Sequence, residues 1–354
     1  MNTNQNDKER SAEGYDIPAV EAWIAANSAY LTPPFTWVRL EGGHSNLTYR
    51  LEDKTGKQAV IRRPPTGELL PKAHDMNREW SLIAGLSPTG FPVPEPIGFC
   101  EDLLVTGALF YVMGFSRGRP LFNNEDTLAW VPVDQRATLA YSFIDTLADL
   151  HVLDPDSVGL GSLGKKEDYI GRQIKAWYRS WESSIEFAQL DDPRAHEFKA
   201  FFLANQPAQV TASVVHGDYY LHNCLFSEAS KVSAVLDWEL ATLGDPLADL
   251  GYTLRAWPEI DDDPFLEPTA PTAVSGLPLR GELAQRYSER TGFPVDLLDY
   301  YVGFNHWKTA AILHGVYARY LAGQKSSEGV DLEALKDGIL KGLAGTERAI
   351  LRLQ

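Results

Sequence analysis

Alternating apolar and polar residues in the first third of the chain predict a small antiparallel sheet. Three short runs enriched in β-branched and aromatic residues are separated by turn-forming residues, which is typical of two successive hairpins. Helical spacing of Met76, Trp80 and Ile83 predicts a helix after the sheet. The predicted elements are a helix at 16–30, strands at 37–41, 46–51 and 58–62, and a helix at 73–86. Together they make a small α+β lobe.

Proline and glycine residues then interrupt the pattern and divide the chain. A proline-rich link at 87–96 leads to a further strand at 108–113, and Gly114 and Gly118 follow that strand closely. We place the lobe boundary there. The predicted division is a disordered start at 1–15, an N-lobe at 16–115 and a C-lobe at 116–354.

Beyond this boundary the apolar residues recur at helical spacing. Aromatic residues in the second of the predicted helices, such as Trp177 and Trp181, are interpreted as core. The proline-rich segment 258–278 contains Asp261–Asp263 and is predicted to be a surface loop, with a substrate-side lid as the alternative. The predicted helices span 133–151, 167–187, 279–291, 294–321 and 331–353.

Composition narrows the classes of protein. The 354 residues suggest about two domains at ~150 residues each, and 44% hydrophobic residues is ordinary for a globular chain. The 32 basic and 48 acidic residues leave a net charge of −16, which disfavours nucleic acid or an anionic membrane as a partner. Cys100 and Cys224 are predicted to be buried thiols in a reducing compartment. Without an apolar run of ~18–20 residues or an apolar leader, the sequence predicts a cytoplasmic protein with no membrane span.

The candidate chemistry lies in His216-Gly217-Asp218, with Asn223 and then Asp237-Trp238-Glu239 downstream. Phosphoryl transfer requires in-line positioning and neutralisation of the charge on the phosphate oxygens, so it needs a carboxylate for the acceptor hydroxyl and oxygen ligands for magnesium. Asp218 is the candidate base, and Asn223 and Asp237 are candidate Mg²⁺ ligands. Glu239 either reaches a second metal or has no metal contact.

Each of these residues also has an ordinary explanation. Asp and Asn near Gly commonly cap helices or form Asx turns, and His216 is interpreted as a structural hydrogen-bonding residue. The combined spacing, with an apolar strand-like run before each motif, favours a site. Asp245 before Pro246 predicts a helix start, and Asp249 lies one turn into that helix. We predict that Asp249 holds the backbone amides of the catalytic segment.

Together these motifs resemble the aminoglycoside phosphotransferase superfamily. The resemblance implies an α+β, two-lobed protein-kinase-like fold, with a small antiparallel-sheet N-lobe and a larger, mainly helical C-lobe. It implies that ATP or another nucleoside triphosphate binds with Mg²⁺. On its own, the turn at Gly42-Gly43 is more often a hairpin without a ligand, and its assignment depends on Arg62 and Glu79 downstream. The implied nucleotide-binding residues are Gly42, Gly43, Ser45 and Asn46 in the phosphate-covering loop, Arg62, Glu79 on the small-lobe helix, and Met113 in the adenine-binding linker.

The sequence departs from the superfamily pattern at several positions. Arg62 stands where a strand lysine is expected; it keeps the charge and adds bidentate phosphate geometry, but the two residues are not interchangeable. This leaves the choice of nucleotide open. Tyr220 and His222 stand where related sequences more often carry Arg and Asp, which leaves the acceptor open.

Three further stretches, 62–65, 154–160 and 235–246, are similar to the kinase-like domains associated with acyl-CoA dehydrogenases. That subgroup implies a hydroxyacyl-type acceptor and a functional link to an acyl-CoA dehydrogenase. The expected function is therefore an ATP-dependent kinase that phosphorylates a small-molecule alcohol. Two alternatives stay open: a catalytically inactive kinase-like binding module, and an acceptor that is an aminoglycoside, homoserine, choline or a sugar.

Overall fold

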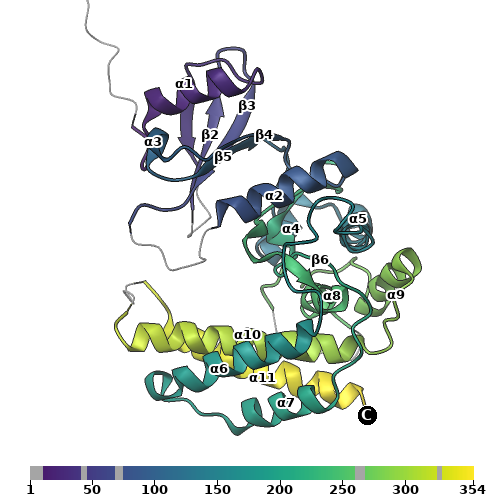
Figure 1. Ribbon diagram of the computed structural model, residues 1–354. Helices are drawn as coiled ribbons and strands as arrows, with labels where there is room; N and C mark the ends of the chain where they lie inside the picture. Colours follow the sequence, from purple (N-terminus) through teal and green to yellow (C-terminus); the bar gives the residue numbers. More distant parts are fainter. Residues whose placement is uncertain (1–10, 41–45, 68–74, 260–267, 325–328) are drawn as a thin grey trace, which may run out of the picture. The chain divides into compact units, whose positions relative to one another are not determined.

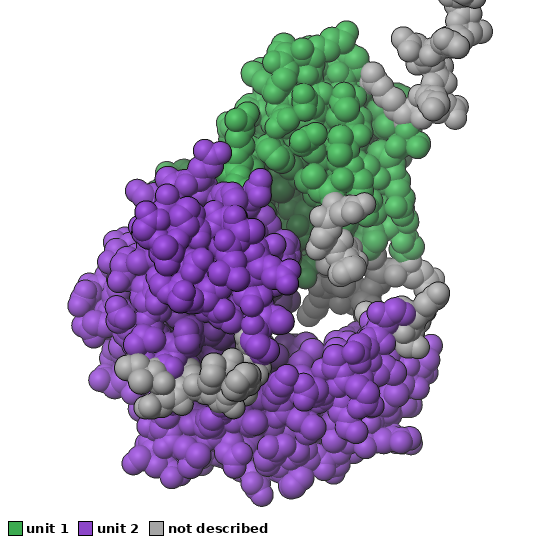
Figure 2. Space-filling view, turned by 180° about the vertical axis from the view of Figure 1, so that it is seen from behind, with its two compact units in different colours: residues 1–118, 233–239 green, residues 119–232, 240–354 purple. Residues whose placement is uncertain are grey.

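The computed structural model describes residues 11–40, 46–67, 75–259, 268–324 and 329–354 (Figure 1). Gly42, Gly43 and Ser45 of the predicted phosphate-covering loop lie outside the described residues. The chain divides into two compact units, each made of two stretches of sequence (Figure 2). Unit 1 is Met1–Gly118 with Ser233–Glu239, and unit 2 is Arg119–Val232 with Leu240–Gln354.

Unit 1 is built on a five-stranded antiparallel sheet with strand order β1-β2-β3-β5-β4. The two predicted hairpins are confirmed, because β1 pairs with β2 and β2 with β3. The sequence did not predict β4, which begins at a proline and lies at the edge of the sheet, where a missing N–H is tolerated. The strands are β1 (Thr36–Arg39), β2 (Leu47–Glu52), β3 (Gln58–Arg63), β4 (Pro96–Cys100) and β5 (Phe110–Gly114).

The two faces of this sheet carry different side chains. Helix α1 (Ile17–Asn27) packs on one face, where Ala59 and Ile61 of β3 join its apolar residues in one core. Side chains alternate along a strand, so Arg62 of β3 points to the opposite face. Its cross-strand neighbour Tyr111 lies on that face too. The residues before α1 are folded as well, since Ala12 is buried in the same core.

Helix α2 (Met76–Leu86) starts three residues later than predicted, because the Asp75 side chain caps it at the backbone N–H of Arg78. Its buried residues include Glu79, a charged side chain among apolar neighbours. The first stretch of unit 1 also contains two short helices, η1 (Ser87–Thr89) and α3 (Leu103–Thr106). Cys100 is a buried free thiol, as predicted, and so is Cys224 in unit 2.

Unit 2 is mainly helical, and its largest layer surrounds α10 (Leu298–Leu321). Helices α6 (Tyr169–Ala188), α7 (Pro193–Ala204) and α11 (Leu332–Arg352) pack against α10 (Figure 1). The predicted helices that correspond to α6, α10 and α11 are confirmed to within a few residues. The sequence did not predict α7. Asp192 caps α7 and Pro193 occupies its first turn, which is a standard helix start.

A second group in unit 2 carries the candidate chemistry. It contains α5 (Arg136–His151), α8 (Pro246–Leu254), α9 (Arg280–Thr291) and the strand pair β6 (Ser213–Val215) and β9 (Thr242–Gly244). Helix α8 crosses α10 closely at Gly251, where an added Cβ would lie 2.6 Å from the backbone carbon of Tyr301. The remaining described elements are α4 (Asn124–Trp130), η2 (Val133–Gln135), η3 (Leu221–Asn223), β7 (Cys224–Phe226), β8 (Val232–Val235) and η4 (Trp238–Leu240).

Candidate active site

In unit 1, Arg62 is the centre of a charged cluster on the face of the sheet opposite α1. Its Nε lies 3.2 Å from Oε2 of Glu79, and its Nη2 lies 2.9 Å from Oδ1 of Asp237. One guanidinium therefore bridges a helix carboxylate and a carboxylate far along the chain. Burial opposes the charge on Arg62, but the neighbouring Tyr111 and the two carboxylates keep its pKa above the ordinary value.

Glu79 is held by more than Arg62. The Tyr111 hydroxyl donates to its Oε2 at 2.8 Å, and the Asn46 amide donates to its Oε1 at 3.3 Å. Burial raises the pKa of Glu79 while Arg62 and the Tyr111 hydrogen bond act in the other direction. The sheet explains this set, because Arg62 and Tyr111 are directly opposite each other on neighbouring strands.

Asp237 follows β8 and adopts a left-handed backbone conformation with φ of 62°. Asp and Asn are among the residues that tolerate this region best. The next residue, Trp238, is buried against Phe91 and donates from Nε1 to the carbonyl of Val235 at 3.1 Å, which fixes the turn. Glu239 lies near enough to Glu79 to raise the pKa of that carboxyl.

Met113, predicted to belong to the adenine-binding linker, lies within β5 opposite Val60 and Pro96 and is almost fully buried. The tyrosine two residues earlier on the same strand contacts Glu79 through its hydroxyl. Within unit 1 the structure thus brings together Asn46, Arg62, Glu79 and Asp237.

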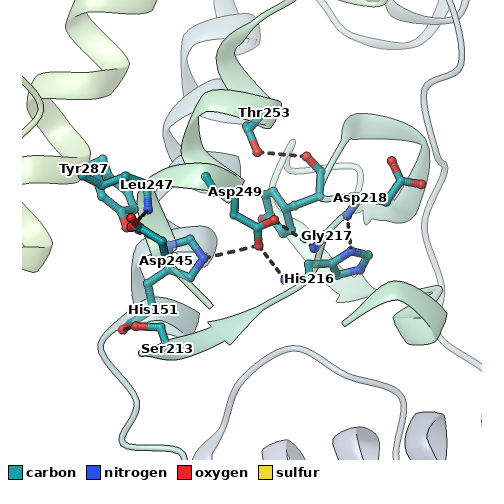
Figure 3. Close-up of polar contacts among 12 residues, drawn as sticks. His151, Ser213, His216, Gly217, Asp218, Asp245, Leu247, Asp249, Thr253 and Tyr287 are labelled. Atoms are coloured by element: carbon teal, nitrogen blue, oxygen red, sulfur yellow. Dashed lines mark hydrogen bonds and ion pairs between the residues drawn. The ribbon is translucent and has the colours of Figure 1, made fainter. Parts of the chain in front are cut away.

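In unit 2, the Asp249 side chain of α8 holds the segment that follows β6 (Figure 3). Its carboxylate accepts hydrogen bonds from the backbone N–H of His216 at 2.5 Å and of Gly217 at 2.8 Å. Burial would raise the pKa of Asp249, but His151, His216 and the Gly217 N–H hold it below the ordinary value. His216 also accepts from the backbone N–H of Asp218 through Nδ1, at 3.3 Å.

The support extends away from the segment through His151. Its Nε2 lies 3.4 Å from Oδ2 of Asp249, and its Nδ1 lies 2.7 Å from the Tyr287 hydroxyl. The hydroxyl of Ser213, at the start of β6, donates to the His151 carbonyl at 2.6 Å. All four of these side chains are buried or nearly so. The segment 216–218 therefore rests on a buried polar network that joins α5, α8 and α9.

Asp218 lies at the partly exposed end of this arrangement, with 27% of its side chain exposed. The Tyr252 hydroxyl donates to its Oδ1, and the Asn223 amide donates to its Oδ2 at 3.0 Å. His222 Nε2 lies 3.6 Å from the same oxygen. Burial would raise the pKa of Asp218, but the hydrogen bonds from His222 and Tyr252 lower it to about 2. The carboxylate is therefore ionised throughout the neutral range.

Each unit contains one side chain with an oxygen atom of the kind that magnesium prefers, Asn223 in unit 2 and Asp237 in unit 1. Asn223 directs its NH₂ group to Asp218, at both the carbonyl and the carboxylate, so its amide oxygen is the atom that could bind a cation. Arg62 contacts only Oδ1 of Asp237, which leaves Oδ2 for the same purpose. Within the described residues, no group of three or more His, Cys, Asp or Glu side chains could hold a metal. Mg²⁺ does not require one, since it typically takes one or two protein ligands with waters and phosphates.

Several residues of these clusters were missed by the sequence analysis. Tyr252 lies three residues after Asp249 on α8, so the i,i+3 spacing places both on one side of the helix. This spacing could have identified Tyr252 from the sequence. His222 was noted only as a departure from a pattern, and Tyr111 was not among the predicted site residues, because their contacts depend on how separate elements pack. Nothing in the sequence indicated His151.

The fold and these two clusters define a protein-kinase-like phosphotransferase class, and comparison with known proteins gives the family. Residues 36–275 match the phosphotransferase enzyme family, and the chain belongs to that family. It is 30% identical to a solved candidate aminoglycoside phosphotransferase from Ralstonia eutropha, with a TM-score of 0.81 over 95% of this chain and 98% of that one. A spectinomycin phosphotransferase solved with ADP and spectinomycin shares the fold at 15% identity and a TM-score of 0.58, covering 93% and 98% of the two chains.

Among relatives of known name, rat acyl-CoA dehydrogenase family member 11 is 35% identical over 333 residues, which is 89% of this chain and 41% of the relative. The chain thus spans less than half of the length of the curated relatives it matches. The predicted two-lobed fold and the predicted family are confirmed. Across the part of the chain that the structure describes, no helix has the length and apolar character needed to cross a membrane.

Proposed function

We propose that this protein is an ATP-dependent kinase that transfers the γ-phosphoryl group to the hydroxyl of a small-molecule alcohol. The observation that carries the proposal is the state of Asp218, which is ionised, held by Tyr252 and Asn223, and partly open to solvent. A structural carboxylate would gain nothing from that opening. A carboxylate that orients an incoming hydroxyl requires it.

In this proposal the acceptor hydroxyl donates a hydrogen bond to Asp218. With a pKa of about 2, Asp218 is too weak a base to remove the proton from a free alcohol, so it orients the oxygen first. The acceptor O–P bond then forms, the bond from the γ-phosphorus to the leaving ADP oxygen breaks, and the acidified hydroxyl proton passes to Asp218. Its neighbours Tyr252 and Asn223 keep the carboxylate oriented through this step.

Unit 1 contributes the nucleotide-binding residues. Arg62 stays positively charged because its pKa remains high, so its guanidinium can bind the phosphates while it keeps contact with a carboxylate. Glu79, which accepts a hydrogen bond from Asn46, holds Arg62 in place. Asp237 and Asn223 are the residues that would hold Mg²⁺. When bound, this cation neutralises charge on the phosphate oxygens. Glu239 lies near Glu79 in unit 1, and the proposed mechanism does not require it as a metal ligand.

For the acceptor we propose a hydroxyacyl compound, with an acyl-CoA dehydrogenase as a functional partner. The names of curated relatives support this choice over an aminoglycoside, homoserine, choline or sugar, since relatives from mouse, rat and Arabidopsis thaliana carry acyl-CoA dehydrogenase names. The rival function is a kinase-like binding module without turnover. The observation that favours the rival is Arg62, which is already paired with two carboxylates of its own unit.

Thermal stability with and without Mg-ATP tests the nucleotide site. A ligand that binds only the folded state at 100 times its dissociation constant adds about 2.7 kcal/mol of stability. We expect a clear rise in melting temperature for the wild-type chain and a much smaller one for Asp237→Asn, which tolerates the left-handed backbone of Asp237 while removing its charge.

Turnover tests the base. Phosphate transfer from ATP to a panel of hydroxyacyl-CoA thioesters and amino alcohols should fall by about 10²–10⁴-fold in Asp218→Asn, which keeps the size of the side chain. A variant that turns over like the wild type would remove Asp218 from the mechanism. A chain that binds Mg-ATP but phosphorylates no alcohol, with intact Asp218, would favour the binding module.

A further inference from the structure

Lys308 is a buried cation in unit 2 that the proposed chemistry does not use. It lies on α10 and is 9% exposed. Among the described residues, no hydrogen bond or ion pair holds its ammonium group; its recorded neighbours are the rings of Trp177 and Tyr252, 5.9 Å and 5.6 Å from Nζ. Lysine is almost never buried in this way unless it is paired, because the desolvated charge is costly.

The packing of α8 against α10 fixes Lys308 in this position. Along one face of α10, the Tyr301 hydroxyl donates to Asp245 at 2.9 Å, and the Asn305 amide donates to the Ala248 carbonyl at 2.9 Å. Lys308 is the next residue of the same face and meets Tyr252, one turn further along α8. The close crossing of the two helices at Gly251 leaves little freedom to shift this register.

Lys308 and Asp218 share a neighbour, Tyr252. Tyr252, whose ring faces Lys308, donates its hydroxyl to Asp218. A second cation, Arg255, lies with its Cζ 3.9 Å from the centre of the same ring. Asp218 and Asp249 favour the charged form of Lys308, but both carboxylates already accept hydrogen bonds from other donors and neither forms an ion pair with it. Burial outweighs them and lowers the pKa of Lys308.

The side chains around the ammonium are more open than Lys308 itself. Trp177, Tyr252, Arg255 and Asp218 are all partly exposed, whereas Lys308 is buried. Aromatic walls, cations and a single proton-accepting carboxylate suit an acceptor that carries a negative charge near its hydroxyl. They suit a polycationic acceptor poorly, because Lys308 and Arg255 would repel it.

Resting on the proposed kinase function, we propose that Lys308 determines acceptor specificity by binding an anionic group, a carboxylate or a phosphate, of the alcohol whose hydroxyl is oriented by Asp218. The carboxylate would belong to a free hydroxy acid, and the phosphate to the carrier portion of a thioester. Lys308 thus acts as a specificity residue, whereas Asp218 contacts the reacting hydroxyl.

The test measures binding, so it does not depend on turnover. The variants are Lys308→Met, which keeps the length of the side chain without its charge, Lys308→Arg, which keeps the charge, and Lys199→Met as a matched control. Lys199 lies on α7 over the ring of Tyr178, with its Nζ 4.7 Å from the ring centre, and is not part of the Asp218 group. Each protein is titrated at constant ionic strength with 3-hydroxybutyrate, 3-hydroxybutyryl-CoA, the neutral 3-hydroxybutyramide, inorganic phosphate and pyrophosphate.

We expect the wild type, Lys308→Arg and Lys199→Met to bind at least one anionic probe, and Lys308→Met to bind it about 10- to 100-fold more weakly, the range of a charged hydrogen bond. The amide should not distinguish the variants. Preference for the free acid or for the thioester identifies the source of the anion. Without ligand, Lys308→Met should melt at or above the wild-type temperature, since it removes a buried unpaired charge.

Three results would overturn this proposal. The first is that Lys308→Met binds every anion as well as the wild type does. The second is that Lys308→Met loses the Mg-ATP stabilisation, which would place the lysine at the nucleotide. The third is a Lys308→Met chain that is less stable than the wild type and is not rescued by Lys308→Arg, which would make the role structural. A missing Mg-ATP response in the wild type would instead contradict the proposed function and leave the anion result standing.

Discussion

Arg62 in unit 1 and Asp249 in unit 2 are both buried charges, but their partners differ in kind. Arg62 is held by two side-chain carboxylates, of which Asp237 has 37% of its side chain exposed. Asp249 is held by two backbone N–H groups and a buried histidine. Side-chain ion pairs can exchange a partner for a phosphate group. Backbone hydrogen bonds cannot be exchanged without moving the loop itself.

This difference separates two tasks within one protein. The unit 1 cluster is suited to reorganise when a ligand arrives, because the partly exposed Asp237 carboxylate competes with the ligand for the Arg62 guanidinium. The unit 2 cluster is suited to keep Asp218 in place before any ligand arrives. It follows that substitutions at Asp249 and its partners should mainly affect stability, and those at Arg62 should mainly affect nucleotide binding.

The largest expected effect is that of Asp249→Ala, which tests whether the backbone hydrogen bonds of unit 2 are needed for stability. The substitution leaves the N–H groups of His216 and Gly217 buried without their acceptor and removes the carboxylate that lies beside His151 Nε2. We expect a loss of about 3–5 kcal/mol in the free energy of unfolding, the range for breaking a buried charged network. Urea denaturation measures it. A loss below about 1 kcal/mol would mean that the loop is held by other contacts.

The next effect concerns Asp245, a second buried carboxylate in unit 2 that has fewer donors. It caps α8 through the Leu247 N–H at 3.1 Å and accepts from Tyr301, yet burial raises its pKa to about 6. A carboxyl whose folded pKa is above its unfolded pKa stabilises the protein at low pH and loses that contribution as the pH rises through the folded pKa. Its charged form is therefore a cost near neutral pH.

We accordingly expect Asp245→Asn to stabilise the chain at pH 8 by on the order of 2–3 kcal/mol, because Asn caps helices as well as Asp and carries no charge. The gain should shrink as the pH falls from about 7 and vanish below about pH 3, where the wild-type carboxyl is protonated in both the folded and the unfolded state. Urea denaturation across this pH range measures it. A gain that is independent of pH would show that ionisation of Asp245 is not its cause.

The sequence predicted most of the elements that build these clusters, because period-2 and period-3.6 patterns follow directly from which side chains face a core. It failed where those patterns are weak. Strand β4 contains Pro96 and Gly98 and shifts register between them, so it lacks a regular alternation. Helix α7 mixes charged and aromatic residues without a clear helical period, although its cap and Pro193 are a recognisable helix start.

For the site, the sequence could identify residues whose motif spacing is local, such as Asp218 with Asn223. It could not identify partners brought by packing from other elements. Tyr111 reaches Glu79 only because α2 packs against β5, and Lys308 reaches Tyr252 only because α10 crosses α8 at a glycine. Such contacts depend on tertiary register, which no single stretch of sequence encodes.

Gly217 allows a smaller and more local test of the unit 2 loop. It has a φ of 83°, and an added Cβ would lie 3.0 Å from the Leu240 carbonyl oxygen. Gly159, also in unit 2, has a φ of 76° but nothing within 4 Å of an added Cβ. Alanine at either position incurs about 1–2 kcal/mol for the left-handed backbone. We expect Gly217→Ala to lose about 1 kcal/mol more than Gly159→Ala in urea denaturation, through crowding at Leu240. Equal losses would show that the loop can yield there.

The smallest effect on stability is expected for Arg62→Lys, which tests the unit 1 side. Lysine keeps a positive charge beside Glu79 but cannot bridge both carboxylates, so the contact with the partly exposed Asp237 is lost. Partly exposed pairs contribute about 0–1 kcal/mol, and we expect a change in unfolding free energy within that range.

Binding should respond differently from stability in this variant. The ammonium loses the bidentate geometry that a guanidinium offers to phosphate, so the dissociation constant for Mg-ATP should rise about tenfold, equivalent to 1.4 kcal/mol. Calorimetric titration measures it, with Lys199→Met as the control. If Arg62→Lys instead destabilises the fold as much as Asp249→Ala does, the side-chain ion pairs of unit 1 are as structural as the backbone hydrogen bonds of unit 2. The proposed exchange of carboxylate for phosphate at Arg62 would then be wrong, because the guanidinium could not leave its partners without unfolding the lobe.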